Sequence, residues 1–184
     1  MTSTMRAVIL SQALTVWAAV SLCALLLVPG ARAEPPCPGF SWDVSNEHAL
    51  FMTAPTALAA GTDRRSAPVV QPGRLVQLDL KPASAVHFAA PPARPPPPGS
   101  YAGLASFKVE RTGNYRISVN QSVWIDVVER GRLIAAVDYE GSRSCDAPHK
   151  VVVFPLSAGK PLVLQVSGAV TSAARITLTP APGP

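Results

Sequence analysis

Two side chains in the stretch VWIDVV, residues 123–128, have the chemistry of a ligand site. Successive residues of a β-strand point to opposite faces, so Trp124 and Asp126 share one face while valine and isoleucine form the other. An indole can stack on a sugar or another ring, and a neighbouring carboxylate can accept hydrogen bonds from hydroxyl groups.

The alternative interpretation of the same residues is structural. Trp124 would pack beneath a loop, and Asp126 would take backbone partners or pair with Arg116 on a neighbouring strand, because buried carboxylates are rare without a partner. We favour this interpretation for Asp126 and keep Trp124, Asp126 and Arg116 as a weak candidate ligand-binding set.

The sequence contains none of the motifs that mark catalytic or metal sites. His48, His87 and His149 lie far apart in the chain and form no H-x-H or H-E-x-x-H pattern. A catalytic zinc needs three protein ligands, and a non-haem iron site needs two histidines and a carboxylate on one face. No serine occupies a G-x-S-x-G elbow, and no glycine-rich phosphate loop is present. We therefore predict no catalytic residue, no metal ligand and no cofactor.

Residues 1–33 have the pattern of a secretory signal peptide: a basic start, an apolar run, a Pro-Gly break and small residues before a cut. We predict cleavage after Ala33 and a periplasmic or secreted protein with no stable membrane span. The rival is an uncleaved anchor, because the apolar run is long enough to cross a bilayer. Removal of Arg6 and Arg32 lowers the formal net charge from +5 to +3. Such a thinly spread surplus is not the clustered basic face of a nucleic-acid binder.

Cys37 and Cys145 are the two cysteines that remain after the predicted leader. In an oxidising compartment two such cysteines most often form a disulfide. A bond across so long a loop stabilises the folded state by up to about 4–5 kcal/mol in the chain-entropy model. It would also fix the segment EPPCPGFSW to the main domain.

The elements that must position these residues fall into two zones of one domain. Residues 34–73 are predicted to be irregular, with one short helix over 47–52 capped by Ser45 or Asn46 and a further turn possible at 57–60. Residues 74–184 are predicted to form a β-sandwich, with a proline-rich surface connection at 91–99, where proline lacks the donor that a sheet needs.

Short alternating strands separated by turns dominate the second zone. Val76, Leu78 and Leu80 alternate with polar residues, and Val86 and Phe88 flank His87 in the same way. From residue 100 onward the turns RTG, NQS and ERGR recur every 8 to 12 residues, and the loop EGSRSCDAPHK and the turn SAGKP separate the later β-branched runs. One of these runs joins Leu133, Ala135, Val137 and Tyr139. The pattern indicates an all-β fold, an antiparallel, jelly-roll-like sandwich.

The segments FKVERTGNYRISV, VWIDVVERGRLI and KVVVFPLSAGKPLVLQVSGA, with the isolated Cys145 before the last, resemble a family of small secreted proteins of alpha-proteobacteria. The resemblance covers roughly residues 104–180 and, more weakly, CPGFSWDVSNEHALF. Some members carry the name homogentisate 1,2-dioxygenase, which implies a ferrous ion held by two histidines and a glutamate in a much larger chain; others are uncharacterised. The last hairpin is also similar to small β-sandwich modules that assist binding in secreted hydrolases.

Two classes of function follow as hypotheses. The first is an exported, non-catalytic β-sandwich protein that binds an envelope protein or glycan, or that assists assembly in the envelope. The second is an enzyme, with the metal-dependent dioxygenase as its most concrete form.

Overall fold

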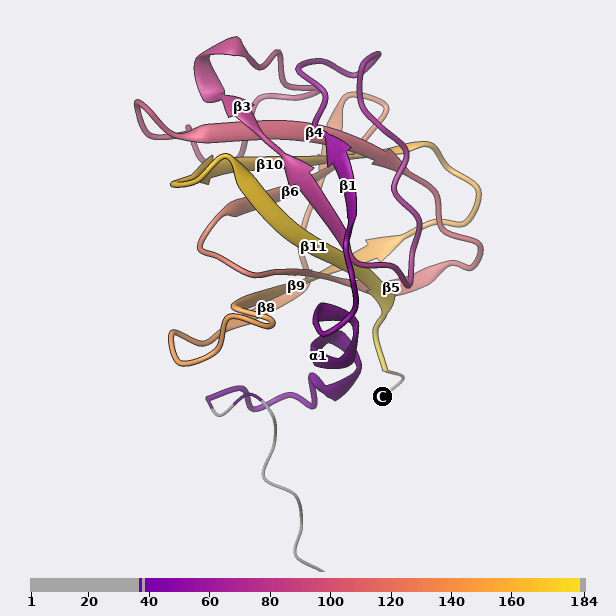
Figure 1. The fold of residues 1–184 in the computed structure, drawn as a ribbon. Helices are drawn as coiled ribbons and strands as arrows, with labels where there is room; N and C mark the ends of the chain where they lie inside the picture. Colours follow the sequence, from indigo (N-terminus) through magenta and orange to yellow (C-terminus); the bar gives the residue numbers. More distant parts are fainter. Residues whose placement is uncertain (1–36, 38, 183–184) are drawn as a thin grey trace, which may run out of the picture. The chain divides into compact units, whose positions relative to one another are not determined.

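The computed structural model describes Cys37 and residues 39–182; the predicted signal peptide and its cleavage site lie outside these residues. The described chain forms two β-sheets packed face to face, with one short α-helix, so the predicted all-β sandwich is confirmed (Figure 1). Within these residues no helix is long and apolar enough to cross a bilayer.

Sheet A contains six strands in the spatial order β1-β2-β11-β5-β9-β8. Their bounds are Thr56–Ala59 (β1), Val76–Asp79 (β2), Ala173–Pro180 (β11), Gly113–Val119 (β5), Lys150–Leu156 (β9) and Asp138–Gly141 (β8). The sequence predicts at most a helical turn at residues 57–60, and that expectation is wrong. Strand β1 instead runs parallel to β2, because pairing with the free edge of β2 satisfies its backbone groups and outweighs the helix propensity of its alanines.

Sheet B contains five antiparallel strands in the order β3-β4-β10-β6-β7. Their bounds are Lys81–Pro82 (β3), Tyr101–Phe107 (β4), Leu162–Ala169 (β10), Trp124–Glu129 (β6) and Arg132–Ile134 (β7). The predicted turn in ERGR is confirmed: Arg130 and Gly131 have φ values of 50° and 77° and join β6 to β7. Positive φ at both central residues is typical of the tight turns that match the twist of a hairpin.

The core between the sheets follows the predicted alternation. Tyr115, Ile117 and Val119 of β5 and the residues Ile125 and Val127 of β6 are all buried in one apolar cluster. The intervening residues of both strands point to the outer faces of the sandwich, as the period of two requires. Trp124 and Asp126 therefore lie on the outer face of sheet B, and Arg116 lies on the outer face of sheet A.

The predicted strand through Leu133 and Tyr139 is instead two short edge strands. Strand β7 pairs with β6 in sheet B, and β8 pairs with β9 in sheet A, so the chain crosses from one sheet to the other at residues 135–137. Strand β7 pairs with the free edge of β6, and β8 pairs with the free edge of β9. A single continuous strand could not pair with edges of two different sheets. Leu133, Val137 and Tyr139 consequently remain 37%, 57% and 71% exposed.

Residues 83–100, which we call the covering segment, lie over the outer face of sheet B. The segment begins with the 3₁₀ helix η1 (Ala83–Ala85), and its residues Val86 and Ala90 are buried against the outward side chains of β4, β6 and β10. The main chain of Ala90 exchanges two hydrogen bonds with the side-chain amide of Gln165. The expected strand around Val86 is wrong because these residues cover a sheet face and join no sheet edge. The proline tract at 91–99 lies outside both sheets, as predicted.

Cys37 and residues 39–52, which we call the N-terminal clamp, cover part of the outer face of sheet A. The predicted disulfide between Cys37 and Cys145 is present. Helix α1 (Ser45–Phe51) packs against β11. The expected cap at Ser45 or Asn46 is wrong: Val44 precedes the helix without a side-chain cap, and the carboxylate of Asp43 instead accepts a hydrogen bond from the Ser45 N–H.

Candidate functional site

Trp124 and Asp126 form a bonded pair at the start of β6. They are two residues apart on one strand, so both point outward, and Trp124 Nε1 donates a hydrogen bond to Asp126 Oδ1 at 2.9 Å. The other carboxylate oxygen, Oδ2, accepts a hydrogen bond from the Ala93 N–H of the covering segment at 3.2 Å. The predicted backbone partner for Asp126 is thus found. The two bonds also fix the plane of the indole.

Asp126 is 6% exposed, and burial makes its charged form less stable than it is in water. Burial raises the pKa of its carboxyl group above the usual value, while the hydrogen bonds from Trp124 and Ala93 and the positive charge of Lys150 act in the opposite direction. The desolvation cost is the largest of these effects because a carboxylate removed from water loses its hydration.

Lys150, the first residue of β9, is a candidate site residue that the sequence interpretation missed. Its ammonium group donates a hydrogen bond to the Val123 carbonyl oxygen at 3.1 Å and lies 5.2 Å from the centre of the Trp124 ring. Burial, reinforced by the positive charge of Arg94, lowers the pKa of Lys150, and Asp126 acts against this shift. Alternation along the strand could have identified it. Lys150 lies on the same core-facing side of β9 as Val152 and Phe154, where a cation is unusual.

A groove of about 620 Å³ lies beside this cluster, on the side of the sandwich where β6 and β7 approach β8 and β9. We call it the edge groove; the residues of its lining that matter here are Arg94, Trp124, Asp126, Leu133, Tyr139 and Lys150. Aliphatic and aromatic side chains, among them Val152 and Phe154, form most of the wall. A second cavity of about 260 Å³ lies along prolines 95–97 and shares Arg94, Trp124 and Lys150 with the edge groove.

The predicted candidate Arg116 does not belong to this site. It lies on the outer face of sheet A, where its Nη1 contacts Glu47 Oε2 at 3.3 Å and the Asp43 carbonyl oxygen at 2.7 Å. The expectation that Arg116 pairs with Asp126 is wrong, because β5 and β6 are consecutive strands but belong to different sheets. Alternation along β5 and β6 correctly predicted that Arg116 and Asp126 point away from the core. It could not show that the two strands belong to different sheets.

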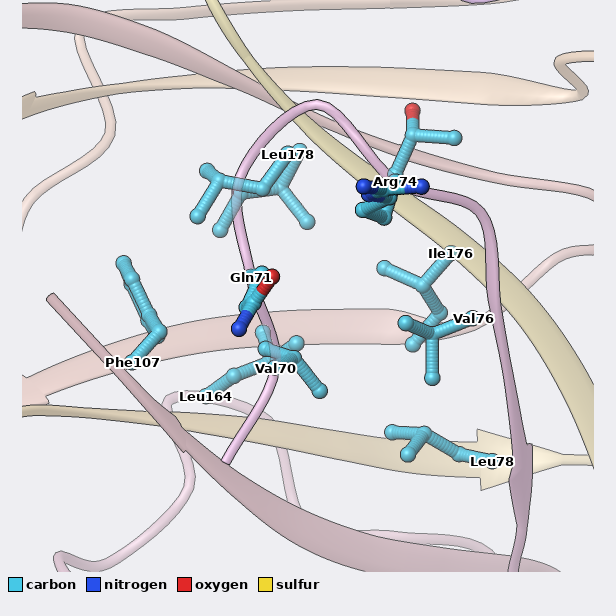
Figure 2. Close-up of a pocket in the computed structure, with 11 residues that line it drawn as sticks. Val70, Gln71, Arg74, Val76, Leu78, Phe107, Leu164, Ile176 and Leu178 are labelled. Atoms are coloured by element: carbon cyan, nitrogen blue, oxygen red, sulfur yellow. The ribbon is translucent and has the colours of Figure 1, made fainter. Parts of the chain in front are cut away.

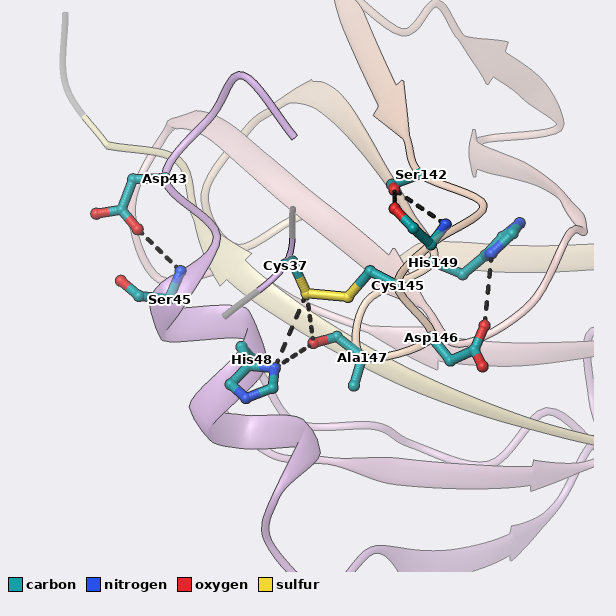
Figure 3. Close-up of a disulfide and its surroundings, with 10 residues drawn as sticks. Cys37, Asp43, Ser45, His48, Ser142, Cys145, Asp146, Ala147 and His149 are labelled. Atoms are coloured by element: carbon teal, nitrogen blue, oxygen red, sulfur yellow. Dashed lines mark hydrogen bonds and ion pairs between the residues drawn. A yellow bond between two sulfur atoms is a disulfide. The ribbon is translucent and has the colours of Figure 1, made fainter. Parts of the chain in front are cut away.

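The three histidines occupy surroundings unlike those of a metal centre. His48 Nδ1 donates a hydrogen bond to the Ala147 carbonyl oxygen at 2.7 Å, and His149 Nδ1 lies 3.8 Å from Asp146 Oδ1 (Figure 3). Figure 3 shows both imidazoles beside the loop that carries Cys145. His87 is exposed in the covering segment. Among the residues that the structure describes, no three His, Cys, Asp or Glu side chains gather closely enough to hold a metal ion.

A further cavity lies between the sheets, lined by residues of both (Figure 2). Its wall is formed by core residues such as Leu78, Phe107 and Leu178, and its polar members are Gln71, Arg74 and Thr177. Its volume of about 10 Å³ accommodates about one water molecule. It is a packing defect of the core and is too small to hold a ligand.

Comparison with models of protein families gives no match to this chain, and comparison with curated protein sequences gives none either. The cluster at the edge groove therefore has to be understood from its own chemistry. It offers a planar indole held by a carboxylate, a half-buried ammonium group and an apolar wall. Groups of these kinds can bind and orient a ligand.

Proposed function

We propose that the protein is an exported, non-catalytic binding protein that holds a glycan of the cell envelope in the edge groove. The observation that carries this proposal is the Trp124 indole, fixed by Asp126 at the wall of a large and mainly apolar groove. A sugar ring has an apolar face of C–H groups and an equatorial rim of hydroxyl groups. It therefore needs both an aromatic surface and polar partners, and the edge groove supplies both.

The rigidity of the indole supports binding. A side chain that is already held in one orientation loses little conformational entropy when a ligand arrives. Both oxygens of Asp126 are engaged, one by Trp124 and one by the covering segment, so the indole is tied to the backbone of a second element. Tyr139, 71% exposed on β8, adds a second aromatic ring to the lining of the same groove.

The size and lining of the groove also support a small ligand. Sites for small molecules have volumes of about 300–1,000 Å³ and walls that are mostly apolar with a few polar groups. The edge groove, at about 620 Å³, lies within this range. A glycan of a few residues fits such a volume, whereas a folded protein partner would need a broader surface.

The disulfide between Cys37 and Cys145 supports a location outside the cytoplasm. Disulfides persist in oxidising compartments such as the periplasm and the exterior of the cell, and they are rare in the cytosol. We propose that the predicted signal peptide directs the chain to one of these compartments, where envelope glycans are available.

Isothermal titration with a panel of hexasaccharides tests the proposal: maltohexaose, cellohexaose, chitohexaose and hexagalacturonate. At least one should bind the wild-type chain from residue 34, and Trp124→Ala should weaken that binding about tenfold or more. Trp42→Ala is the matched control, because the Trp42 ring lies away from the edge groove. Its centre is 5.3 Å from the guanidinium carbon of Arg116, on the outer face of sheet A. This control should leave the affinity unchanged.

Tyr139→Ala provides a second variant, since its exposed side chain can be removed without affecting the core. Urea unfolding of each variant shows whether it is folded before its affinity is measured. Binding by none of the four hexasaccharides would refute the proposal. Equal affinity in wild type, Trp124→Ala and Tyr139→Ala would move the binding site away from the edge groove.

No contact in the described structure favours the alternative of a metal-dependent dioxygenase. That activity needs two histidines and a carboxylate around one ion. His48 and His149 instead contact a carbonyl oxygen and a solvent-exposed carboxylate, and His87 lies on a different element.

A further inference from the structure

The geometry points to an acidic glycan: we propose that a carboxylate on a sugar ring binds between Arg94 and Lys150 while the ring itself lies against Trp124. This inference rests on the proposed function and specifies the class of glycan. It follows from the charges around the junction of the two cavities.

The edge groove and the smaller cavity meet at three residues. Arg94, Trp124 and Lys150 line both of them, one cation from the covering segment and the other from β9. A ligand that spans the junction therefore contacts two cations and one aromatic ring at the same time. Prolines 95–97 form the far wall of the smaller cavity and give it a stiff backbone.

The charge at this junction is positive. Of the described residues that line the two cavities, Asp126 alone carries a carboxylate, and both of its oxygens already accept hydrogen bonds. The positive charge of Arg94 lowers the pKa of Lys150, and the carboxylate of Asp126 acts in the opposite direction. Neither Arg94 nor Lys150 forms an ion pair with another residue in the described part of the chain.

An anion placed between the two cations would remove their mutual repulsion. Lys150 uses one of its three N–H groups on the Val123 carbonyl oxygen and keeps two for a ligand. Arg94 is exposed and offers a planar guanidinium that can bind both oxygens of a carboxylate. These hydrogen bonds would form at a partly buried site, where charge-assisted bonds are stronger than in water.

The neighbouring ring favours an anion that belongs to a sugar. Lys150 lies 5.2 Å from the centre of the Trp124 ring, so a group bound to the ammonium is held next to the indole. A uronic acid carries its carboxylate directly on the ring, which lets the charge reach the two cations while the C–H face contacts Trp124. A free inorganic anion would use the cations and leave the apolar groove empty.

The test compares hexagalacturonate with its fully methyl-esterified form, which has the same sugar rings without the charges. Isothermal titration should show the acid binding about tenfold or more tightly than the ester at low salt. Arg94→Gln and Lys150→Gln should each remove most of this preference. Lys108→Gln, which removes a charge from an exposed position outside both cavities, should preserve it.

The pH dependence of the affinity for hexagalacturonate distinguishes a specific role of Lys150 from a general effect of positive charge. The groups that act on its ammonium are Arg94 from the covering segment and Asp126 and Trp124 from β6, and Tyr139 from β8 lines the same groove. Because the pKa of Lys150 is lowered in the free protein, affinity for hexagalacturonate should fall as the pH rises through that pKa. Lys150→Arg keeps the charge without titrating and should bind the acid with a much weaker pH dependence.

Each outcome distinguishes this inference from the proposed function. Equal binding of acid and ester, both abolished by Trp124→Ala, would overturn the acidic specificity and leave the glycan-binding function standing. If neither hexagalacturonate nor its ester binds but maltohexaose, cellohexaose or chitohexaose does, the acidic specificity is likewise overturned and the glycan-binding function stands. Saturable binding of inorganic phosphate alone, with the same dependence on Lys150, would show a free-anion site and overturn the sugar as the ligand.

Discussion

The N-terminal clamp and the covering segment perform the same structural task on opposite sides of the sandwich. Each lies over the outer face of one sheet, and each hides a carboxylate there: Glu47 is 1% exposed and Asp126 is 6% exposed. The two carboxylates differ in what surrounds them. That difference separates a purely structural contact from a candidate binding site.

Glu47 is paired with a cation. One of its oxygens lies 3.3 Å from Arg116 Nη1, and the other accepts a hydrogen bond from Thr179 Oγ1 at 2.6 Å. Trp42 covers the guanidinium of Arg116, with its ring centre 5.3 Å away. Glu47 and Arg116 are paired with each other, so neither of these two charges is available to a ligand.

Asp126 has only neutral hydrogen-bond donors, from Trp124 and the Ala93 backbone. The nearby cation, Lys150, donates to a carbonyl oxygen and lines an open groove. The comparison teaches that two buried carboxylates can differ in whether the neighbouring cation remains accessible to a ligand. Where the cation forms an ion pair with the carboxylate, as Arg116 does with Glu47, the contact stabilises the fold.

The largest effect that separates the two regions is expected from Glu47→Ala. This change leaves Arg116 buried without its partner, and breaking such a pair lowers the free energy of unfolding by about 3–5 kcal/mol. Urea unfolding followed by fluorescence measures the loss. Glu47→Leu combined with Arg116→Met removes both charges and should lose less; an equal loss in the double variant would show that packing, and not the uncompensated charge, dominates.

Reduction of the disulfide weakens the same region by a different route. Opening the Cys37–Cys145 bond, which joins residues 108 apart in sequence, should lower the free energy of unfolding by about 2–4 kcal/mol through the greater freedom of the unfolded chain. Urea unfolding with and without a thiol reductant measures it. The double variant Cys37→Ser with Cys145→Ser should have the same free energy of unfolding as the reduced protein, and the reductant should not change it. Hexasaccharide affinity should persist in both, because the edge groove lies in the sandwich; its loss would show that the clamp shapes the groove.

Local pattern was sufficient to predict the core strands of both sheets and the disulfide, but not the edge strands β1, β7 and β8. Alternation placed Ile117 and Val127 in the core and Trp124 with Asp126 on one outward face, because a period of two fixes the face of every residue on a strand. The cysteines could be paired by elimination. These properties depend only on residues close in sequence or on a count of one residue type.

The parts that could not be predicted depend on which strands become neighbours. Arg116 was expected beside Asp126 because β5 and β6 are consecutive in the chain, yet they lie in different sheets. Lys150 reaches Trp124 from the other sheet, across the side of the sandwich, and no local pattern records that approach. The partner of Glu47, Arg116, is likewise 69 residues away in sequence.

The smallest expected effect is a dependence of stability on pH that belongs to Asp126. Burial raises the pKa of its carboxyl group, so the folded chain binds this proton more tightly than the unfolded chain does. The resulting contribution is fully present below the unfolded pKa, about 4, and is lost as the pH rises through the folded pKa. Wild type should therefore lose stability relative to Asp126→Asn over that interval.

Urea unfolding of both proteins at a series of pH values measures this difference. Asparagine keeps one acceptor oxygen for Trp124 or Ala93 but not both, which adds a cost of about 1–3 kcal/mol that does not vary with pH. The diagnostic quantity is therefore the slope of the difference and not its size. A flat difference would mean that Asp126 is solvated well enough to ionise without cost. Its resemblance to Glu47 would then be one of position alone, because a carboxylate that stays hydrated remains charged without a paired cation such as Arg116 and without the hydrogen bond from the indole.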